Sequence, residues 1–146
     1  MELNLLIDTN VVLDSFLERE PFLSKSREAI SLSKKYPVKS FISASSVTDI
    51  YYISYRGLKY HQVVRELFKE LFKFVGVVTV TDKDIHAAFA LDWKDFEDSV
   101  QYAVAASNGF DGIVTRNMAG FANDTVKIFT PEEACRYVEE IKEGLT

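Results

Sequence analysis

The sequence predicts an α/β fold, a three-layer α/β/α sandwich around a mainly parallel five-stranded sheet. Short apolar runs alternate with longer segments of helical periodicity along the whole chain. The runs are nearly continuous in apolarity, as in strands that helices cover on both faces. The chain has 146 residues without an internal repeat, low-complexity tract or linker, so we expect a single domain over residues 1–146.

Five of the apolar runs are expected to form the strands. They are short, rich in β-branched or aromatic residues, and bounded by polar or turn-forming residues. In chain order they are Leu3–Ile7, Val38–Ser43, Val77–Thr81, Gly112–Thr115 and Val126–Phe129.

Helices are expected between and after these strands. Asp95 can cap the helix that begins at Phe96, and Thr130 followed by Pro131 is a typical helix start. We expect Val100 and Val104 on the packed face of the Phe96 helix, and Gln101 and Tyr102 off that face. The expected helices are Asn10–Glu18, Leu23–Tyr36, Ser46–Arg56, Tyr60–Phe74, Asp82–Leu91, Phe96–Asn108 and Pro131–Lys142.

Composition favours a cytoplasmic globular protein without a membrane segment. Hydrophobic residues make up 47% and charged residues 27% of the chain, which is ordinary globular composition. No apolar run is long enough to span a membrane, and the residues after Met1 lack the basic start of a signal peptide. The single cysteine, Cys135, cannot form an internal disulfide, so we expect a reducing compartment.

The net charge of −5 is not typical of a nucleic-acid-binding protein. Several acids that share a metal site would, however, be partly neutralised by bound cations. The charge therefore weakens the case for nucleic-acid binding without removing it.

Acidic side chains follow the predicted strands at the places where parallel sheets bind ligands. Asp8 ends the first strand, Asp49 lies near the start of the helix after the second strand, and Asp98 lies in the first turn of the Phe96 helix. Each also has an ordinary interpretation as a helix cap or a first-turn acid. Four acids lie between Asp92 and Asp98 against one Lys, and within a few ångströms of each other they would raise one another's pKa unless a cation lay between them. We therefore predict a divalent metal site.

The end of the strand at which a residue lies decides whether it can belong to the expected metal site. Asp111 precedes the strand Gly112–Thr115 and lies at the opposite edge of the sheet, so we exclude it. Thr115, Arg116 and Asn117 follow at the carboxyl end of that strand and belong to the expected site.

The histidines give no indication of zinc. His61 and His86 each lie near a helix start without a partner at metal-ligand spacing. Oxygen ligands from Asp, Asn and Thr suit Mg²⁺ or Mn²⁺ instead.

A cluster of tyrosines is larger than one helix face can bury. We expect Tyr51 and Tyr55 to share a face, and Tyr52 and Tyr60 to lie at a subunit interface. A stacking platform for nucleic-acid bases is the alternative.

Four segments in order along the chain resemble the PIN-domain nucleases, in particular the small bacterial and archaeal toxins of VapBC-type toxin–antitoxin pairs. They are Ile7–Asp14 (IDTNVVLD), Ser43–Asp49 (SASSVTD), Asp95–Ala103 (DFEDSVQYA) and Phe110–Asn117 (FDGIVTRN). The resemblance implies a PIN fold, Mg²⁺ or Mn²⁺ and cleavage of single-stranded RNA. It also implies an antitoxin partner and a homodimer.

The resemblance carries over residue by residue. Asp8 and Asp98 match the first and third acids of the family, and Asp49 stands where the second is more often Glu. These three are the implied catalytic and metal-binding residues. Asn10 accompanies Asp8 in the opening motif, and Thr115 matches a Ser or Thr that completes the polar cleft.

The segment after the fourth motif departs from the family. Its members place an Asp directly after the Arg or slightly later, before a Phe, where this chain has Asn117 and Gly120. Asn117 can supply a carbonyl ligand and Asp124 lies within reach on the loop, so both are candidate ligands for a weakly held second metal. Arg116 is expected to contact a substrate phosphate.

Rival functions remain open at this point. A catalytically degenerate PIN-like module that binds RNA or protein agrees with Asn117, Gly120 and the acidic net charge. A haloacid-dehalogenase-type phosphatase is disfavoured because Asn10 occupies the place of its second Asp. A receiver domain would need an acidic pair after the first strand, which is absent.

Overall fold

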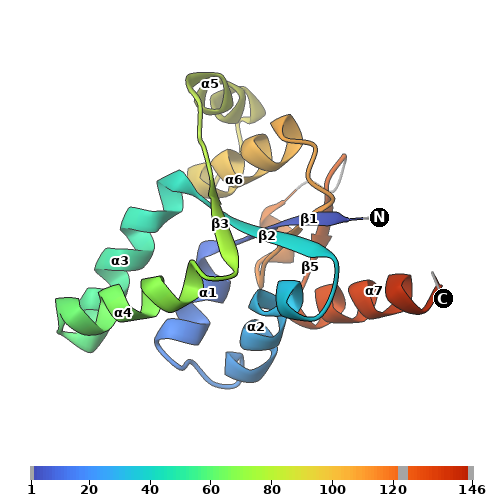
Figure 1. The fold of residues 1–146 in the computed structure, drawn as a ribbon. Coiled ribbons are helices and arrows are strands. Elements are labelled where there is room, and N and C mark those ends of the chain that lie inside the picture. Colours follow the sequence, from blue (N-terminus) through green and yellow to red (C-terminus); the bar gives the residue numbers. More distant parts are fainter. Residues whose placement is uncertain (1, 122–124, 145–146) are drawn as a thin grey trace.

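A parallel sheet of five strands in the order β3-β2-β1-β4-β5 forms the centre of the computed structural model, which describes residues 2–121 and 125–144 (Figure 1). All four pairs of neighbouring strands are parallel. The strands are β1 (Leu3–Ile7), β2 (Val38–Ser43), β3 (Val75–Val78), β4 (Gly112–Val114) and β5 (Lys127–Phe129).

Helices cover both faces of this sheet, which confirms the expected three-layer architecture. Helices α5 and α6 lie on one side of the sheet, and α1, α2 and α7 lie on the other (Figure 1). The helices are α1 (Thr9–Phe16), α2 (Leu23–Ile30), α3 (Ala44–Leu58), α4 (His61–Leu71), α5 (Asp82–Leu91), α6 (Phe96–Ser107) and α7 (Pro131–Gly144), with short 3-10 helices at Leu32–Lys34 and Met118–Gly120.

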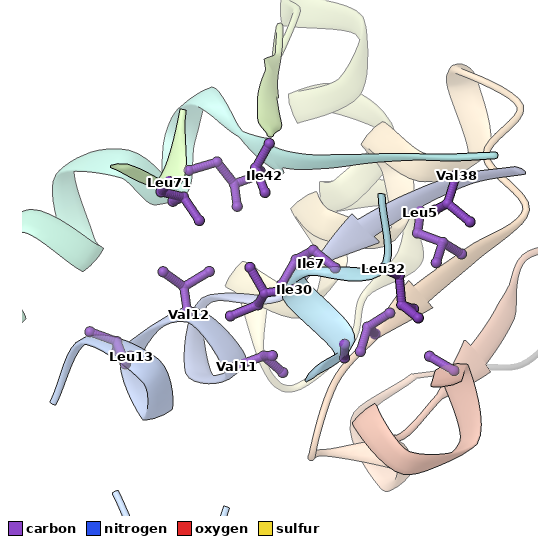
Figure 2. Close-up of a cluster of buried hydrophobic side chains, with 14 of the residues drawn as sticks. Leu5, Ile7, Val11, Val12, Leu13, Ile30, Leu32, Val38, Ile42 and Leu71 are labelled. Atoms are coloured by element: carbon purple, nitrogen blue, oxygen red, sulfur yellow. The ribbon is translucent and has the colours of Figure 1, made fainter. Parts of the chain in front are cut away.

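Alternate side chains of the central strand β1 enter two separate cores. Leu5 and Ile7 point into the larger core, which they share with α1, α2, α3 and α4 (Figure 2). Leu6 points to the opposite face and packs with Tyr102 and Ala105 of α6. All three β1 side chains are at most 1% exposed, so the strand is fixed on both faces.

The register of the sheet brings the ends of its central strands to one edge. Ile7 at the end of β1 pairs with Val114 at the end of β4. The backbone N–H of Asp8 then donates to the carbonyl of Val114 over 2.9 Å. The residues after β1 and β4 therefore lie beside each other at the carboxyl edge.

Strand β3 differs from its predicted range, Val77–Thr81, because it starts and ends earlier. Gly76 lies inside the strand, where an added Cβ would come within 3.0 Å of the Phe41 ring. The glycine allows this close packing and is not a strand boundary. Thr81 instead forms a capping box with Asp84 at the start of α5.

The predicted helix Leu23–Tyr36 is also wrong as one element. Helix α2 ends at Ile30, and Leu32–Lys34 forms a separate 3-10 turn. The N–H of Ser31 bonds back to the carbonyls of both Arg27 and Glu28, which tightens the last turn of α2.

Helix α6 is buried more completely than its sequence pattern indicates. Gln101 and Tyr102, which we expected off the packed face, are 1% and 7% exposed. The helix lies between the sheet, through Tyr102, and α5, through Val100 and Val104. None of the helices in the described ranges is long and apolar enough to cross a membrane.

Candidate active site

Asp8 is the buried carboxylate at the end of the central strand. It is 3% exposed and is the N-cap of α1, where its Oδ1 accepts from the N–H of Thr9 over 2.8 Å. Oδ1 also accepts from the Gln101 amide over 3.2 Å, and Oδ2 accepts from the Thr115 hydroxyl over 2.7 Å. Burial raises the pKa of Asp8, although these hydrogen bonds act in the opposite direction. Capping and a place in the site are thus combined in one residue.

Thr115 connects Asp8 with the loop after β4. Its side chain is fully buried, and its hydroxyl donates to Asp8 and accepts from the N–H of Asn117 over 3.0 Å. Asn117 Nδ2 in turn donates to Asp98 Oδ2 over 3.1 Å. A chain of hydrogen bonds therefore runs from Asp8 through this loop to Asp98.

Asp98 enters the site from the first turn of α6. Its N–H is capped by Asp95 Oδ1 over 3.1 Å, and the residue is 6% exposed. Burial and then the charges of Asp8, Asp95 and Glu97 raise the pKa of Asp98 to about 7, while the Asn117 hydrogen bond lowers it. Asp8 and Asp98, far apart in sequence, therefore share one electrostatic environment.

Glu97 is a member of the cluster that the sequence analysis missed. Burial of its carboxyl, followed by the charges of Asp8, Asp49 and Asp95, raises the pKa of Glu97. Asp49 itself is exposed on α3 and is linked to the cluster only through this effect. The run of acids from Asp92 to Asp98 was the available signal for Glu97.

Gln101 is the second residue that the sequence analysis missed. It is one turn beyond Asp98 on α6 and donates to Asp8, yet its Oε1 is a buried atom without a hydrogen-bond partner. Asn10 Oδ1, on the first turn of α1, is likewise buried without a partner. Carboxylate and amide oxygens are the kinds of ligand that a hard divalent cation prefers.

The carboxylates do not form a ready-made three-ligand chelate. Among the described residues no three His, Cys, Asp or Glu side chains lie close enough to hold one ion together. Asp8 and Asp98 are brought together with Asn117, and Asp49 is not. Asp124, the other candidate ligand, lies outside the described residues.

Arg116 is turned away from Asp8 and Asp98. Its guanidinium binds Asp14 in a bidentate ion pair, with Nε–Oδ2 and Nη2–Oδ1 distances of 2.6 and 3.0 Å. It also stacks on Phe22, with its central carbon 3.9 Å from the ring centre. Asp14 is fully buried and accepts a further hydrogen bond from Ser26. The charge of Arg116 is therefore directed to Asp14.

Gly120 packs directly against Asp98. A Cβ added to Gly120 would overlap Asp98 Oδ2 and would lie 2.6 Å from Asn117 Nδ2. An aspartate at this position would require Asp98 or the loop to move. The observed position of the Asp98 carboxylate therefore requires a glycine at residue 120.

Other residues weighed from the sequence lie away from this edge. Asp111 precedes β4 and accepts a hydrogen bond from the N–H of Asn4 at the opposite edge of the sheet. Tyr51 and Tyr55 share a face, as predicted, and both contact His61. The Tyr51 hydroxyl lies 2.7 Å from His61 Nδ1, and the Tyr55 ring stacks 3.8 Å from the imidazole.

The fold and the acids at its carboxyl edge can now be compared with known proteins. The family model described as "PIN domain" matches residues 4–119, and the chain belongs to this family. The match spans β1 to the loop after β4, and thus includes Asp8, Asp49, Asp98 and Asn117.

A curated relative is similar over most of both chains. "Ribonuclease VapC1" of Aquifex aeolicus is 25% identical over 134 residues, which cover 88% of this chain and 91% of the relative.

Solved structures show the same fold. A toxin–antitoxin complex from Klebsiella pneumoniae has a TM-score of 0.64 at 20% identity, covering 86% of this chain and 96% of the other. Mycobacterium tuberculosis VapC20, a sarcin-ricin-loop-cleaving toxin, has a TM-score of 0.61 at 14% identity, covering 83% and 92%. VapBC2 from Rickettsia felis, bound to a promoter DNA fragment, has a TM-score of 0.70 at 11% identity, covering 88% and 98%.

Proposed function

We propose that this protein is a Mg²⁺- or Mn²⁺-dependent endoribonuclease that hydrolyses phosphodiester bonds of single-stranded RNA. The observation that carries the proposal is the meeting of two buried carboxylates, Asp8 and Asp98, at the carboxyl edge of a parallel sheet. Asp98 has a pKa of about 7 in the absence of a cation, partly because Asp8 is close to it. A bound cation would remove this repulsion.

Asp8, Asp98 and Asn117 are the proposed ligands of the cation, with Asp49 and Asp124 as further ligands recruited to it. When bound, the ion lowers the pKa of a water molecule and withdraws charge from the phosphate. Asp8, Asp49 and Asp98 are the proposed catalytic residues.

The remaining residues orient these carboxylates and the substrate. Gln101 donates a hydrogen bond to Oδ1 of Asp8, and Thr115 donates one to Oδ2. We assign Asn10, Thr115 and Arg116 to the substrate side of the site. Because Arg116 is paired with Asp14, a contact to phosphate requires that it exchange one or both of these hydrogen bonds.

The biological role that we propose is that of a toxin in a type II toxin–antitoxin pair. The named ribonuclease relative and the toxin–antitoxin complexes of the same fold support it. A cognate antitoxin protein, a homodimer and a cytoplasmic location are parts of the same proposal.

A non-catalytic PIN-like module that binds RNA or protein is the second candidate. The observation that favours it is Gly120, whose contact with Asp98 leaves no room for the aspartate of the family pattern. Asn117 also replaces a carboxylate by a neutral amide.

Cleavage of a structured RNA pool distinguishes the two candidates. The purified protein, free of any antitoxin, is incubated with Mn²⁺, Mg²⁺ or EDTA, and the products are mapped. The proposal expects cuts in single-stranded regions with either metal and none in EDTA. A folded protein that cuts with neither Mn²⁺ nor Mg²⁺ would instead support the binding module.

A further inference from the structure

We propose that the cleft beside Asp98 binds a nucleobase of single-stranded RNA, next to the phosphate that meets the carboxylates. This inference rests on the proposed ribonuclease function and identifies the part of the substrate that the site holds. The cleft has a volume of about 940 Å³. Residues from two segments, 93–98 and 117–121, line it, among them Trp93, Lys94, Phe96, Asp98, Asn117 and Phe121.

Aromatic side chains make up much of the cleft wall. Trp93 is half-buried and held in place by Tyr102 and Phe121, with ring centres 5.1 and 6.1 Å away. Phe96 is 43% exposed, and its ring lies 4.5 Å from that of Phe89. Rings that are anchored on one side and open on the other are the usual platform for unpaired bases.

A positively charged side chain in the same cleft matches the phosphate of a nucleotide. Lys94 is exposed and forms no ion pair within the described ranges, so its ammonium is free to contact a backbone phosphate. A cation and aromatic faces together complement a nucleotide better than a purely apolar ligand.

The position of the cleft fixes its relation to the chemistry. Asp98 belongs both to the cleft wall and to the pair of buried carboxylates. A base seated against Trp93 or Phe96 would therefore place its own phosphate, or the adjacent one, beside Asp98. Tyr51 and Tyr55, which we weighed as part of a stacking platform, contact His61, and no tyrosine among the described residues lines this cleft.

The single tryptophan makes the inference directly measurable, because Trp93 is the only one in the chain. An eight-nucleotide oligouridylate is titrated into the wild-type protein with Ca²⁺ in place of Mg²⁺, and gels verify that the RNA stays intact. We expect saturable quenching of Trp93 fluorescence. An abasic ribose-phosphate oligomer of equal length should bind much more weakly and leave the fluorescence unchanged.

Variants test the aromatic contact itself. Phe96→Ala is expected to weaken oligouridylate binding roughly tenfold to a hundredfold, the usual contribution of one stacked base. Phe96→Leu keeps an apolar side chain at the start of α6 and should show a similar loss if the ring face matters. Tyr60→Ala removes another exposed aromatic side chain, far along the sequence from the cleft, and should bind as wild type.

The outcomes separate this inference from the proposed function. Wild-type affinity in both Phe96 variants, or equal binding of the abasic oligomer, would overturn the base-binding cleft even if RNA is still cut. Quenching and Phe96-dependent binding without cleavage in Mg²⁺ or Mn²⁺ would support the cleft and contradict the ribonuclease.

Discussion

At the scale of single residues, Asp98 is a carboxyl whose pKa lies far from its ordinary value. Its carboxyl is buried among other acids and has a pKa of about 7, against an ordinary value of 3.8. The folded protein therefore favours the protonated form more strongly than the unfolded chain does. The stability that follows from this is fully present below the ordinary pKa and is lost as the pH rises through 7.

The first prediction concerns this pH dependence. In EDTA, the wild-type free energy of unfolding should fall relative to Asp98→Asn between pH 4 and 8, by a few kcal/mol in total. Urea denaturation at several pH values measures it. Parallel pH profiles for the two proteins would show that Asp98 titrates normally.

Thr115 gives the second prediction at this scale. Thr115→Val keeps the shape of the side chain but removes the hydroxyl that donates to Asp8 Oδ2. We expect RNA cleavage to fall about 10- to 100-fold, as for other residues that orient metal ligands. Thr115→Ser, which keeps the hydroxyl, is the matched control and should retain most activity. Equal losses in both variants would contradict a hydrogen-bonding role.

At the scale of elements, α1 and the loop after β4 are joined by the Asp14–Arg116 pair. Asp14 is fully buried, whereas the Arg116 side chain is 27% exposed. Removing the arginine leaves a buried carboxylate with Ser26 as its remaining partner. Removing the charge of Asp14 leaves a guanidinium that water can reach. The two substitutions should therefore differ in cost.

The third prediction follows from this asymmetry. Arg116→Met should lower the free energy of unfolding by about 3–5 kcal/mol, and Asp14→Asn should lower it by less. Chemical denaturation of both variants and of the double variant measures the coupling. If Arg116→Met lowers cleavage without lowering stability, the arginine acts on the substrate and not as a link between elements.

The bounds of the strands and helices show which parts of the fold could be predicted from the sequence. The bounds of β1, β2 and α5 were predicted correctly, because apolar runs and a strong cap mark them. The bounds of β3 were predicted wrongly because Gly76 lies inside the strand, where it packs closely against the Phe41 ring of the neighbouring strand. No local pattern contains such a contact.

The candidate site also contains residues that the sequence predicted and residues that it did not. Asp8 could be placed from sequence because it directly follows the central strand, and Asp98 because it lies in the first turn of a helix. Gln101 and Glu97 were missed because the hydrogen bond of Gln101 to Asp8 and the electrostatic effect of Asp8 on Glu97 depend on how α6 docks on the sheet. The pairing of Arg116 with Asp14 likewise joins residues that are 102 positions apart in the sequence.

At the scale of the whole molecule, a net charge of −5 with acids gathered at one edge predicts stabilisation by divalent cations. Mn²⁺ at about 100 times its Kd should stabilise the fold by about 2.7 kcal/mol, a rise in Tm of roughly 5–10 °C. Thermal melts with Mn²⁺ and with EDTA measure this fourth prediction. An equal rise in Asp8→Asn would place the ion elsewhere.

The central claim is that Asp8 belongs to a metal-dependent site that cuts RNA, and a comparison of two aspartate variants tests it most directly. Cleavage of the RNA pool in Mn²⁺ is measured for the wild type, Asp8→Asn and Asp111→Asn. Asp111 lies at the opposite edge of the sheet and serves as the matched control. We predict that Asp8→Asn abolishes metal-dependent cleavage and that Asp111→Asn retains it. Wild-type cleavage by a folded Asp8→Asn protein would contradict the account.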